Sequence, residues 1–351
     1  MLKKDFGEVK KALKPKNGNV QEIWATYVNV EKTTLFSSKK KVFSLSEDEQ
    51  LVYSNLFSKV LSGKAEKNLF ELDLSEDNSR SFYSISEKHD EGAIEKVVED
   101  IIESYKSKES FAVLIALGSY AIPSYSSDGA KLEGSDGNYN FMICAVCPTK
   151  LAKPSVVYHH NKDFFEGSKR DYVLQNPDIG FLYPTFEHRE PNANRLLYFA
   201  KKDLYPTVLE KVLGNDIPLT SEDYLADFSE KVEESFGGNV DVETLYNINT
   251  SLEEKMVTKQ YQEEDLVLDE ADINDVLVKN GGKKVEFDGQ INPSSLVSNK
   301  FKLEKDKDIV INASSDGMKE IKQEIINGRS YLLIPVDDMT LNGVKLSWIV
   351  S

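Results

Sequence analysis

Two β-rich, largely apolar runs near the middle of the chain constrain its fold most. They are SFAVLIALGSYAI, from Ser110 to Ile122, and NYNFMICAVC, from Asn138 to Cys147. Neither run contains a charged residue, and the polar, Gly-rich segment PSYSSDGAKLEGSDG joins them. Apolar runs of this length, bounded by turn residues, predict buried strands. We therefore expect a sheet at the centre of the fold.

Segments with helical periodicity surround these runs. Residues 2–13 and 91–107 carry apolar side chains at the spacing of one helix face. Ser46 precedes Glu49 by three residues, which is the spacing of a capping box at the start of a helix. Asp269 is a plausible N-cap for a short helix near the C-terminal end.

The character of the chain changes after residue 220. Residues 221–265 are acidic and helical in pattern, whereas the last fifty residues are β-rich. The runs EIINGRSYLLIPV and TLNGVKLSWIV each place Asn-Gly between extended flanks, which predicts two hairpins. We expect an α+β fold with a central mixed or antiparallel sheet and flanking helices. The predicted divisions are an α+β main domain over 1–220, an acidic helical segment over 221–265 and a small α+β domain over 266–351.

Composition narrows the class of protein. Of 351 residues, 40% are hydrophobic and 29% charged, which suits a globular protein with a substantial core. No apolar run approaches the length that spans a bilayer. The first residues, MLKKDFGEVKKALK, lack the apolar stretch of a signal peptide, and two cysteines give no disulfide framework. We expect a bacterial-type cytoplasmic protein without a membrane partner.

The net charge is −16, but it is unevenly spread. Residues 1–41 hold ten lysines and four acidic residues, a net charge of +6, which leaves −22 for the remainder. Such asymmetry favours a polyanion contact or a self-complementary surface, and a solvated lysine-rich face is the alternative. The candidate phosphate-binding residues are Lys3, Lys4, Lys10, Lys11, Lys39, Lys40 and Lys41.

The run FMICAVCPTKLAKPSVVYHH contains both cysteines and two of the four histidines. In a strand, Cys144 and Cys147 point to opposite faces and lie roughly 10 Å apart, which excludes shared metal ligation or a disulfide. We expect core cysteines and no metal site. His159 and His160 stay open as residues that could line a cleft.

A second candidate is NPDIGFLYPTFEHRE. Asp178 followed by Glu187 and Arg189 loosely matches the Pro-Asp…Asp/Glu-x-Lys arrangement of metal-dependent nucleases. Arginine replaces the lysine here and does not readily lose a proton, so the alternative is a turn with a rim salt bridge. The chain has no phosphate loop, dinucleotide fingerprint, zinc-protease motif or nucleophile elbow. We expect no cofactor, and no catalytic constellation stands out.

Taken together, several stretches resemble a known family. SYAIPSYSSDG, ICAVCPTKLAKPSVVYH, NPDIGFLYPTFEHREPNANRLLYFAKK, LVLDEADINDVL and INGRSYLLIPVDD are similar, in order and spacing, to the bacterial domain-of-unknown-function family 4317 over essentially the whole chain. That resemblance implies no activity, cofactor or catalytic residue. FAVLIALGSY, FMICAVCP and RLLYFAKKDLYPTVLEKVLG are also similar to strands and a helix of the NdpA-type nucleoid-associated family. This second resemblance implies association with DNA or with a DNA-handling partner.

Three functions follow as expectations. The first is a non-enzymatic, nucleoid-associated or nucleic-acid-handling protein that contacts phosphates through the N-terminal lysines. The second is a protein-interaction or assembly module that uses its acidic surface against a basic partner, with a homodimer as one form of it. The third is a divergent metal-dependent nuclease at Asp178 and Glu187.

Overall fold

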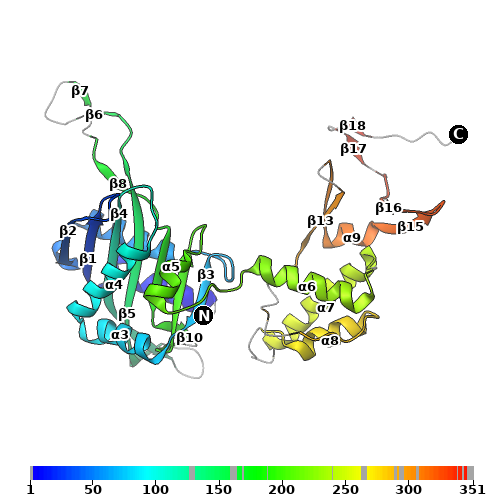
Figure 1. Cartoon of the computed structure of the whole chain (residues 1–351), viewed down its shortest axis with the longest axis horizontal. Helices are drawn as coiled ribbons and strands as arrows, with labels where there is room; N and C mark the ends of the chain where they lie inside the picture. Colours follow the sequence, from blue (N-terminus) through cyan, green and yellow to red (C-terminus); the bar gives the residue numbers. More distant parts are fainter. Residues whose placement is uncertain are drawn as a thin grey trace. The chain divides into compact units, whose positions relative to one another are not determined.

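A computed structural model describes residues 3–125, 131–158, 164–167, 170–187, 189–238, 240–261, 267–287, 291, 296–305, 308–337, 339–341 and 344–345. The chain divides into two compact units, Met1–Pro218 and Leu219–Ser351 (Figure 1). The first unit contains the large sheet. The second contains three longer helices and several short hairpins.

An antiparallel sheet forms the centre of the first unit, with strand order β2-β1-β4-β5-β9-β12-β3 and β8 added to β5. Its strands are β1 (Val20–Val28), β2 (Thr34–Lys41), β3 (Leu69–Asp73), β4 (Phe111–Tyr125), β5 (Lys131–Leu151), β8 (Tyr172–Leu174), β9 (Ile179–Tyr183) and β12 (Arg195–Ala200). Every pairing among them is antiparallel. The predicted α+β class is therefore confirmed, with the sheet in its antiparallel form.

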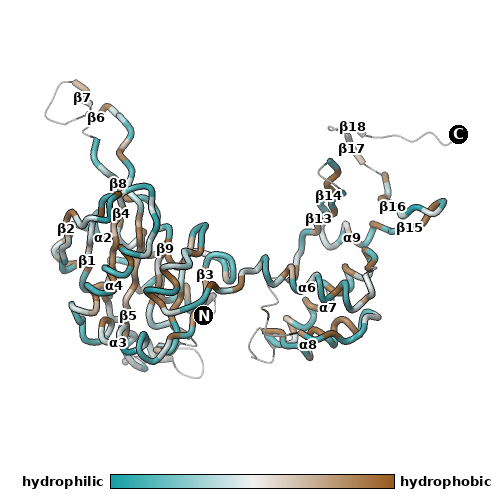
Figure 2. Tube along the Cα trace, viewed as in Figure 1, coloured by the Kyte–Doolittle hydropathy of each residue, from teal (hydrophilic) through white to brown (hydrophobic). Residues whose placement is uncertain are grey.

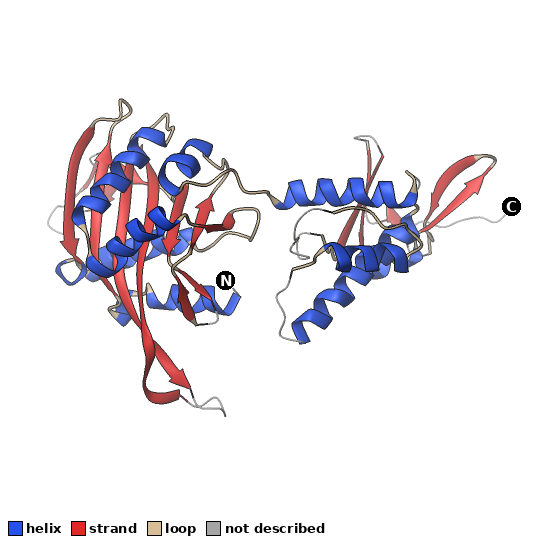
Figure 3. Cartoon of the chain, turned by 60° about the horizontal axis from the view of Figure 1, so that its bottom comes forward, coloured by secondary structure: helices blue, strands red, loops and turns tan. Residues whose placement is uncertain are grey.

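Helices cover both faces of this sheet (Figure 3). The first face packs against α3 (Glu76–Lys88), α4 (Glu91–Ser104), α5 (Pro206–Val208) and the π-helical turn η3 (Leu209–Leu213). The second face packs against α1 (Lys3–Ala12) and α2 (Glu47–Val60). Because both faces are buried, the middle parts of β4 and β5, Phe111–Leu117 and Phe141–Cys147, are apolar at every position rather than alternating (Figure 2).

The two cysteines illustrate this arrangement. Cys144 belongs to the cluster under α3 and α4, and Cys147 to the cluster under α1 and α2. Both thiols are free and buried, and burial raises the pKa of Cys147 to about 12. The prediction of core cysteines on opposite faces is confirmed.

Short elements complete the first unit and include the predicted capping box. These elements are η1 (Pro15–Asn17), η2 (Val42–Ser44), β6 (Val156–Tyr158), β7 (Phe165–Gly167), β10 (Thr185–Glu187) and β11 (Glu190–Asn192). β6 pairs with β7, and β10 with β11. The Ser46 hydroxyl accepts from the Glu49 amide, and the Glu49 carboxylate accepts from the Ser46 amide, so α2 begins as predicted.

The second unit has its own core, built by α6 (Ser221–Phe236), α7 (Val242–Tyr261) and α8 (Glu270–Lys279). Asp269 caps α8 as predicted. The acidic helices of 221–265 and α8 share this core, and the predicted domain divisions at 220 and 265 stay a prediction.

Two-stranded hairpins and one short helix follow in the second unit. They are β13 (Lys300–Lys305) with β14 (Ile309–Ser314), the helix α9 (Ser315–Glu320), β15 (Lys322–Ile326) with β16 (Arg329–Leu333), and β17 (Thr340–Leu341) with β18 (Val344–Lys345). The last two hairpins are those predicted from Asn-Gly. Asn327 and Gly328 both have positive φ, as the expected tight turn requires. No helix within the described part of the chain is long and apolar enough to cross a membrane.

Candidate functional site

The first unit has an exposed extension of its sheet, which we call the arm and define as residues 149–174. Its root pairs the end of β5 with β8, and its far part pairs β6 with β7. Figure 1 shows the β6–β7 ribbon leaving the sheet between β5 and β8. The described residues of the arm are 149–158, 164–167 and 170–174.

Large apolar side chains are exposed along the arm. The far part carries Val156, with 70% of its surface exposed, and Phe164, with 79% exposed. The Tyr158 and Phe165 rings face each other across β6 and β7, with their centres 5.9 Å apart. The remaining exposed members are Leu151, Tyr172 and Val173. Several large apolar side chains exposed on one element favour an interaction site.

The arm also differs from the rest of the chain in charge. Residues 149–174 contain Lys150, Lys153, Lys162, Lys169 and Arg170 against three acidic residues. The arm therefore carries +2, and the remainder of the chain carries −18. A basic, aromatic extension thus projects from an acidic protein.

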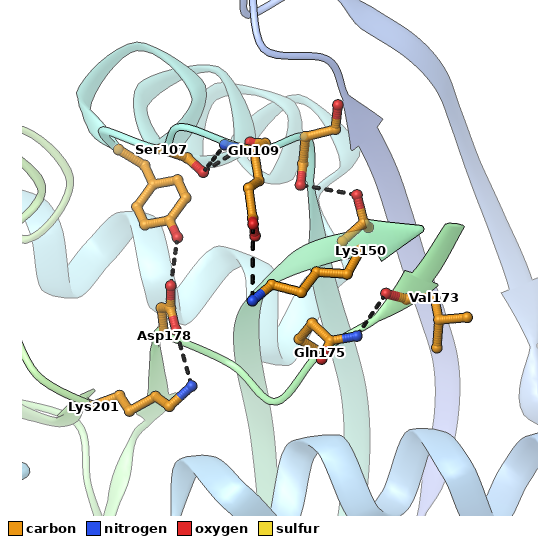
Figure 4. A network of polar contacts seen from close by, with 10 residues as sticks. Ser107, Glu109, Lys150, Val173, Gln175, Asp178 and Lys201 are labelled. Carbon is orange, nitrogen blue, oxygen red and sulfur yellow. Dashed lines mark hydrogen bonds and ion pairs between the residues drawn. The ribbon is translucent and has the colours of Figure 1, made fainter. Parts of the chain in front are cut away.

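The root of the arm is held by polar contacts that Figure 4 shows in part. The Thr149 hydroxyl donates to the Ser110 carbonyl at 2.9 Å, and the Gln175 backbone N–H donates to the Pro148 carbonyl at 2.8 Å. Lys150 Nζ lies 3.8 Å from a Glu109 carboxylate oxygen. These contacts fix the direction in which the arm leaves the sheet.

Asp178 lies beside this root, at the start of β9. Its carboxylate accepts a hydrogen bond from the Tyr105 hydroxyl at 3.1 Å and one from Lys201 Nζ at 3.3 Å (Figure 4). Burial, followed by the negative charge of Asp178, raises the pKa of Tyr105. The Tyr105 hydroxyl therefore stays protonated and acts as a donor, so the contacts of Asp178 join α4, β9 and β12.

Glu187 and Arg189 lie at the other end of this segment. The Glu187 carboxylate accepts from the Thr185 hydroxyl at 3.1 Å and the Asn192 side chain at 3.2 Å, and it lies 3.9 Å from Arg195. Burial alone would raise the pKa of Glu187, but the Asn192 hydrogen bond and its other partners outweigh burial and lower it. Arg189 has a left-handed backbone and donates to the Pro123 carbonyl.

The structure does not bring Asp178 and Glu187 together. Asp178 contacts Lys201 just after β12, whereas Glu187 contacts Arg195 at the beginning of β12. The five residues of β9 alone span about 16 Å. Among the described residues, no group of three or more His, Cys, Asp or Glu side chains could hold a metal ion.

The five candidate lysines whose side chains the structure describes are dispersed. Lys39 and Lys41 point to the α4 side of the sheet, where Lys39 pairs with Glu91 over the Trp24 ring and Lys41 lies 2.6 Å from Glu22. Lys40, whose strand partner is Ile23, points to the opposite face. The side chains of Lys3 and Lys4, together with His159, His160 and His188, lie outside the described residues.

The two remaining candidates belong to α1. Lys10 is half-buried, and burial followed by repulsion from Lys59 lowers its pKa. Lys11 is exposed. The described members of the predicted lysine set are therefore divided between α1 and the two faces of β2.

The Glu22 carboxyl gives a pH-dependent prediction. Its side chain is 6% exposed and accepts from Trp24 Nε1 at 2.7 Å as well as from Lys41. Burial would raise the pKa of Glu22, but the hydrogen bonds from Lys41 and Trp24 outweigh burial and lower it. A depressed carboxyl pKa adds stability above the unfolded-state pKa, and that stability is lost as the pH falls through the folded-state pKa.

Replacing Glu22→Gln is expected to lower the free energy of unfolding at neutral pH by about 1–2 kcal/mol. The difference from the unmodified chain should shrink below about pH 4.5, where the carboxyl becomes protonated. Urea unfolding at a series of pH values measures both. Glu91→Gln is the control. It breaks the more exposed ion pair between Glu91 and Lys39, another lysine of β2, and should change stability less. An undiminished difference at low pH would contradict this account.

Sequence reasoning did not identify the arm, although YHHNKDFFEGSKRDYV interleaves aromatic and basic residues. That mixture does not show whether the aromatic residues are buried. They are exposed because β6 to β8 extend past the part of the sheet that the helices cover. The polar network at Asp178 was likewise not identified. Its partners Tyr105 and Lys201 are distant in sequence and adjacent only in the fold.

These features define an α+β protein with a helix-covered antiparallel sheet and an exposed β arm, followed by a second helical and β-hairpin unit. The chain belongs to the family described as domain of unknown function (DUF4317), whose model matches residues 1–344. The resemblance inferred from the sequence to this family is therefore confirmed. Neither a curated protein nor a solved structure matches the chain.

Proposed function

We propose that this protein is an interaction module that assembles with a second copy of itself through the arm. The observation that carries the proposal is the exposure of seven large apolar side chains on one basic extension of the sheet. This corresponds to the assembly function expected from the sequence, but with the arm as the contacting element. It is a binding function and needs no catalytic residue.

The physical reason lies in the weakness of a bare hairpin. Two paired strands without a covering layer are marginally stable in water, and β6 and β7 pair only with each other among the described residues. A protein surface that covered the arm would bury Val156, Phe164 and Tyr172. Each Å² of apolar area removed from water contributes about 25 cal/mol of favourable free energy. Such burial would order the hairpin and provide most of the binding energy.

Charge complementarity favours a second copy of this chain as the occupant. The arm carries +2, while the rest of the chain carries −18. The arm of one copy and the acidic surface of another therefore attract each other, and the attraction is reciprocal in a twofold dimer. Because part of the attraction is ionic, assembly should weaken as salt shortens the screening length from about 10 Å at 0.1 M to about 3 Å at 1 M.

Sedimentation velocity over a wide range of protein concentration tests this proposal. We expect the full chain to dimerise, and the double variant Phe164→Ala with Tyr172→Ala to dimerise about thirtyfold more weakly, as loss of an aromatic interface anchor typically produces. Tyr261→Ala removes an equally exposed aromatic from α7 in the second unit and serves as the matched control. Circular dichroism verifies that the variants fold.

Two results would overturn the proposal. One is a full chain that stays monomeric at every concentration. The other is a double variant that dimerises as strongly as the Tyr261→Ala control.

A nucleic-acid contact is the second candidate, and one observation favours it. Lys11, Lys14, Lys16 and Lys40 form no ion pair within the described part of the chain. Lys39 and Lys41, by contrast, are already paired with Glu91 and Glu22. Labelled duplex DNA added to the same sedimentation runs at about 50 mM salt tests this candidate, because low salt favours phosphate contacts. A cytoplasmic location at the nucleoid belongs to this second proposal. Because Asp178 and Glu187 lie apart, the structure gives the nuclease expectation no support.

A further inference from the structure

Strand β2 forms an open edge of the sheet. All eight of its residues, Thr34–Lys41, are exposed, and within the described residues it pairs only with β1. Its outer edge therefore presents backbone N–H and C=O groups to solvent. Lysines commonly protect such edges from unwanted pairing, but here they occupy only the last three positions. Leu35 and Phe36 are more than half exposed in the unprotected half.

A groove begins where β2 ends. It has a volume of about 610 Å³ and lies between η1, the beginning of β1, η2 and α2. Its apolar walls include Leu13, Ile23 and Phe57, which are buried residues of the core below α1 and α2. Phe43 also lines the groove, and 86% of its surface is exposed. A phenylalanine in this position provides apolar contact area to a bound molecule at no cost to the core.

Charged residues of both signs lie around the groove. Lys14 lines it, and Lys16 lines an adjoining hollow of about 680 Å³ that shares Lys14. The acidic residues of that hollow, Glu47 and Asp48, belong to the first turn of α2 instead. Neither Lys14 nor Lys16 forms an ion pair with another described residue. The η1 side of the groove therefore offers two lysines that have no ion-pair partner among the described residues, beside the apolar wall of the groove.

We propose that β2 and this groove together bind an extended segment of a partner protein by strand addition. The segment would pair its backbone with the outer edge of β2, place one apolar side chain against Phe43 in the groove, and direct a carboxylate towards Lys14 and Lys16. Open strand edges with an adjoining side-chain pocket recognise peptides in this way: the backbone supplies affinity and the pocket supplies selectivity. This site is separate from the arm and does not depend on self-assembly.

The first experiment identifies the peptide class. A displayed library of random nonapeptides is selected on the immobilised full chain and on its Phe43→Ala variant. We expect the full chain to enrich peptides with alternating apolar residues and at least one Asp or Glu, and the variant to enrich them about tenfold less. Equal enrichment on both proteins, or enrichment of basic peptides, would overturn the proposal.

The second experiment tests strand addition directly. The most enriched peptide is synthesised in two N-methylated forms, one methylated at odd positions and one at even positions. Successive N–H groups of a strand point to opposite edges, so only one form should lose binding to β2. Loss from both forms, or from neither, would contradict pairing along one edge. Fluorescence anisotropy of the labelled peptides gives the affinities.

Side-chain variants locate the bound peptide. Lys14→Glu with Lys16→Glu should weaken binding by about tenfold or more, and the effect should diminish at high salt. Lys96→Glu, which changes an exposed lysine of α4 on the other face, and Tyr261→Ala should leave binding unchanged. The arm double variant should also bind the peptide normally. A variant that loses self-assembly but still binds the peptide, or the reverse, would show that the arm and the β2 groove are separate sites. Each of the two proposals can therefore fail without the other.

Discussion

Phe181→Ala is expected to lower the free energy of unfolding of the first unit by about 3–5 kcal/mol, the range for truncating a buried phenylalanine. Phe181 is 2% exposed and lies on β9, between β5 and β12. Its ring packs edge-on against Phe82 of α3, with the ring centres 5.7 Å apart. Truncation would leave a cavity between the sheet and the α3–α4 layer, where neighbouring strands restrict collapse.

Urea unfolding of the full chain measures this effect. Trp24 fluorescence reports on the first unit, and Trp348→Phe removes the second tryptophan of the chain. Phe43→Ala is the matched control because its ring is exposed, and it should change stability by no more than about 0.5 kcal/mol. A loss below about 1 kcal/mol for Phe181→Ala would show that this part of the core is not packed as described.

Gly180→Ala is expected to be nearly as damaging, although it adds only one methyl group. A Cβ atom at Gly180 would overlap the Cys144 carbonyl oxygen and stand 2.6 Å from Val60 Cγ2. The first obstacle is backbone of the adjacent strand and cannot move aside, so we expect a loss near the upper end of the overpacking range, about 3 kcal/mol. The β5–β9 pairing and the α2 contact would both have to shift.

Gly137→Ala provides the control for this substitution. Gly137 lies on β5, and nothing is within 4 Å of the position that its Cβ would occupy. Its stability change should stay within about 1 kcal/mol and could be favourable, because alanine restricts the unfolded chain. Similar losses at both glycines, in the same urea experiment, would exclude close packing at Gly180 as the cause.

Local patterns predicted much of the fold. The capping box at Ser46, the N-cap at Asp269 and the Asn327-Gly328 turn each depend on residues a few positions apart, and all three formed as expected. The opposite orientation of Cys144 and Cys147 follows from the two-residue period of a strand. Such features are decided by neighbouring residues, so a single sequence suffices to predict them.

The candidate sites depended on contacts that the sequence does not display. The run of three lysines on β2 appeared to be one basic patch, but strand alternation divides it, and Glu91 comes from a distant helix to pair with Lys39. Asp178 and Glu187 would converge only if the chain turned back between them. It continues instead through β9 and β10, so each carboxylate acquires its own cation.

The strand order of the sheet has a consequence for how the protein is made. Strand β3 pairs with β12, with Asp73 opposite Arg195, so more than a hundred residues are synthesised before β3 obtains its only strand partner among the described residues. Until Ala200 has left the ribosome, Phe70 and Leu72 have no completed core to enter. Pairings over such sequence distances slow folding. The first unit therefore completes its sheet late in translation. Until then the nascent chain exposes apolar strands and unpaired strand edges, which favour aggregation.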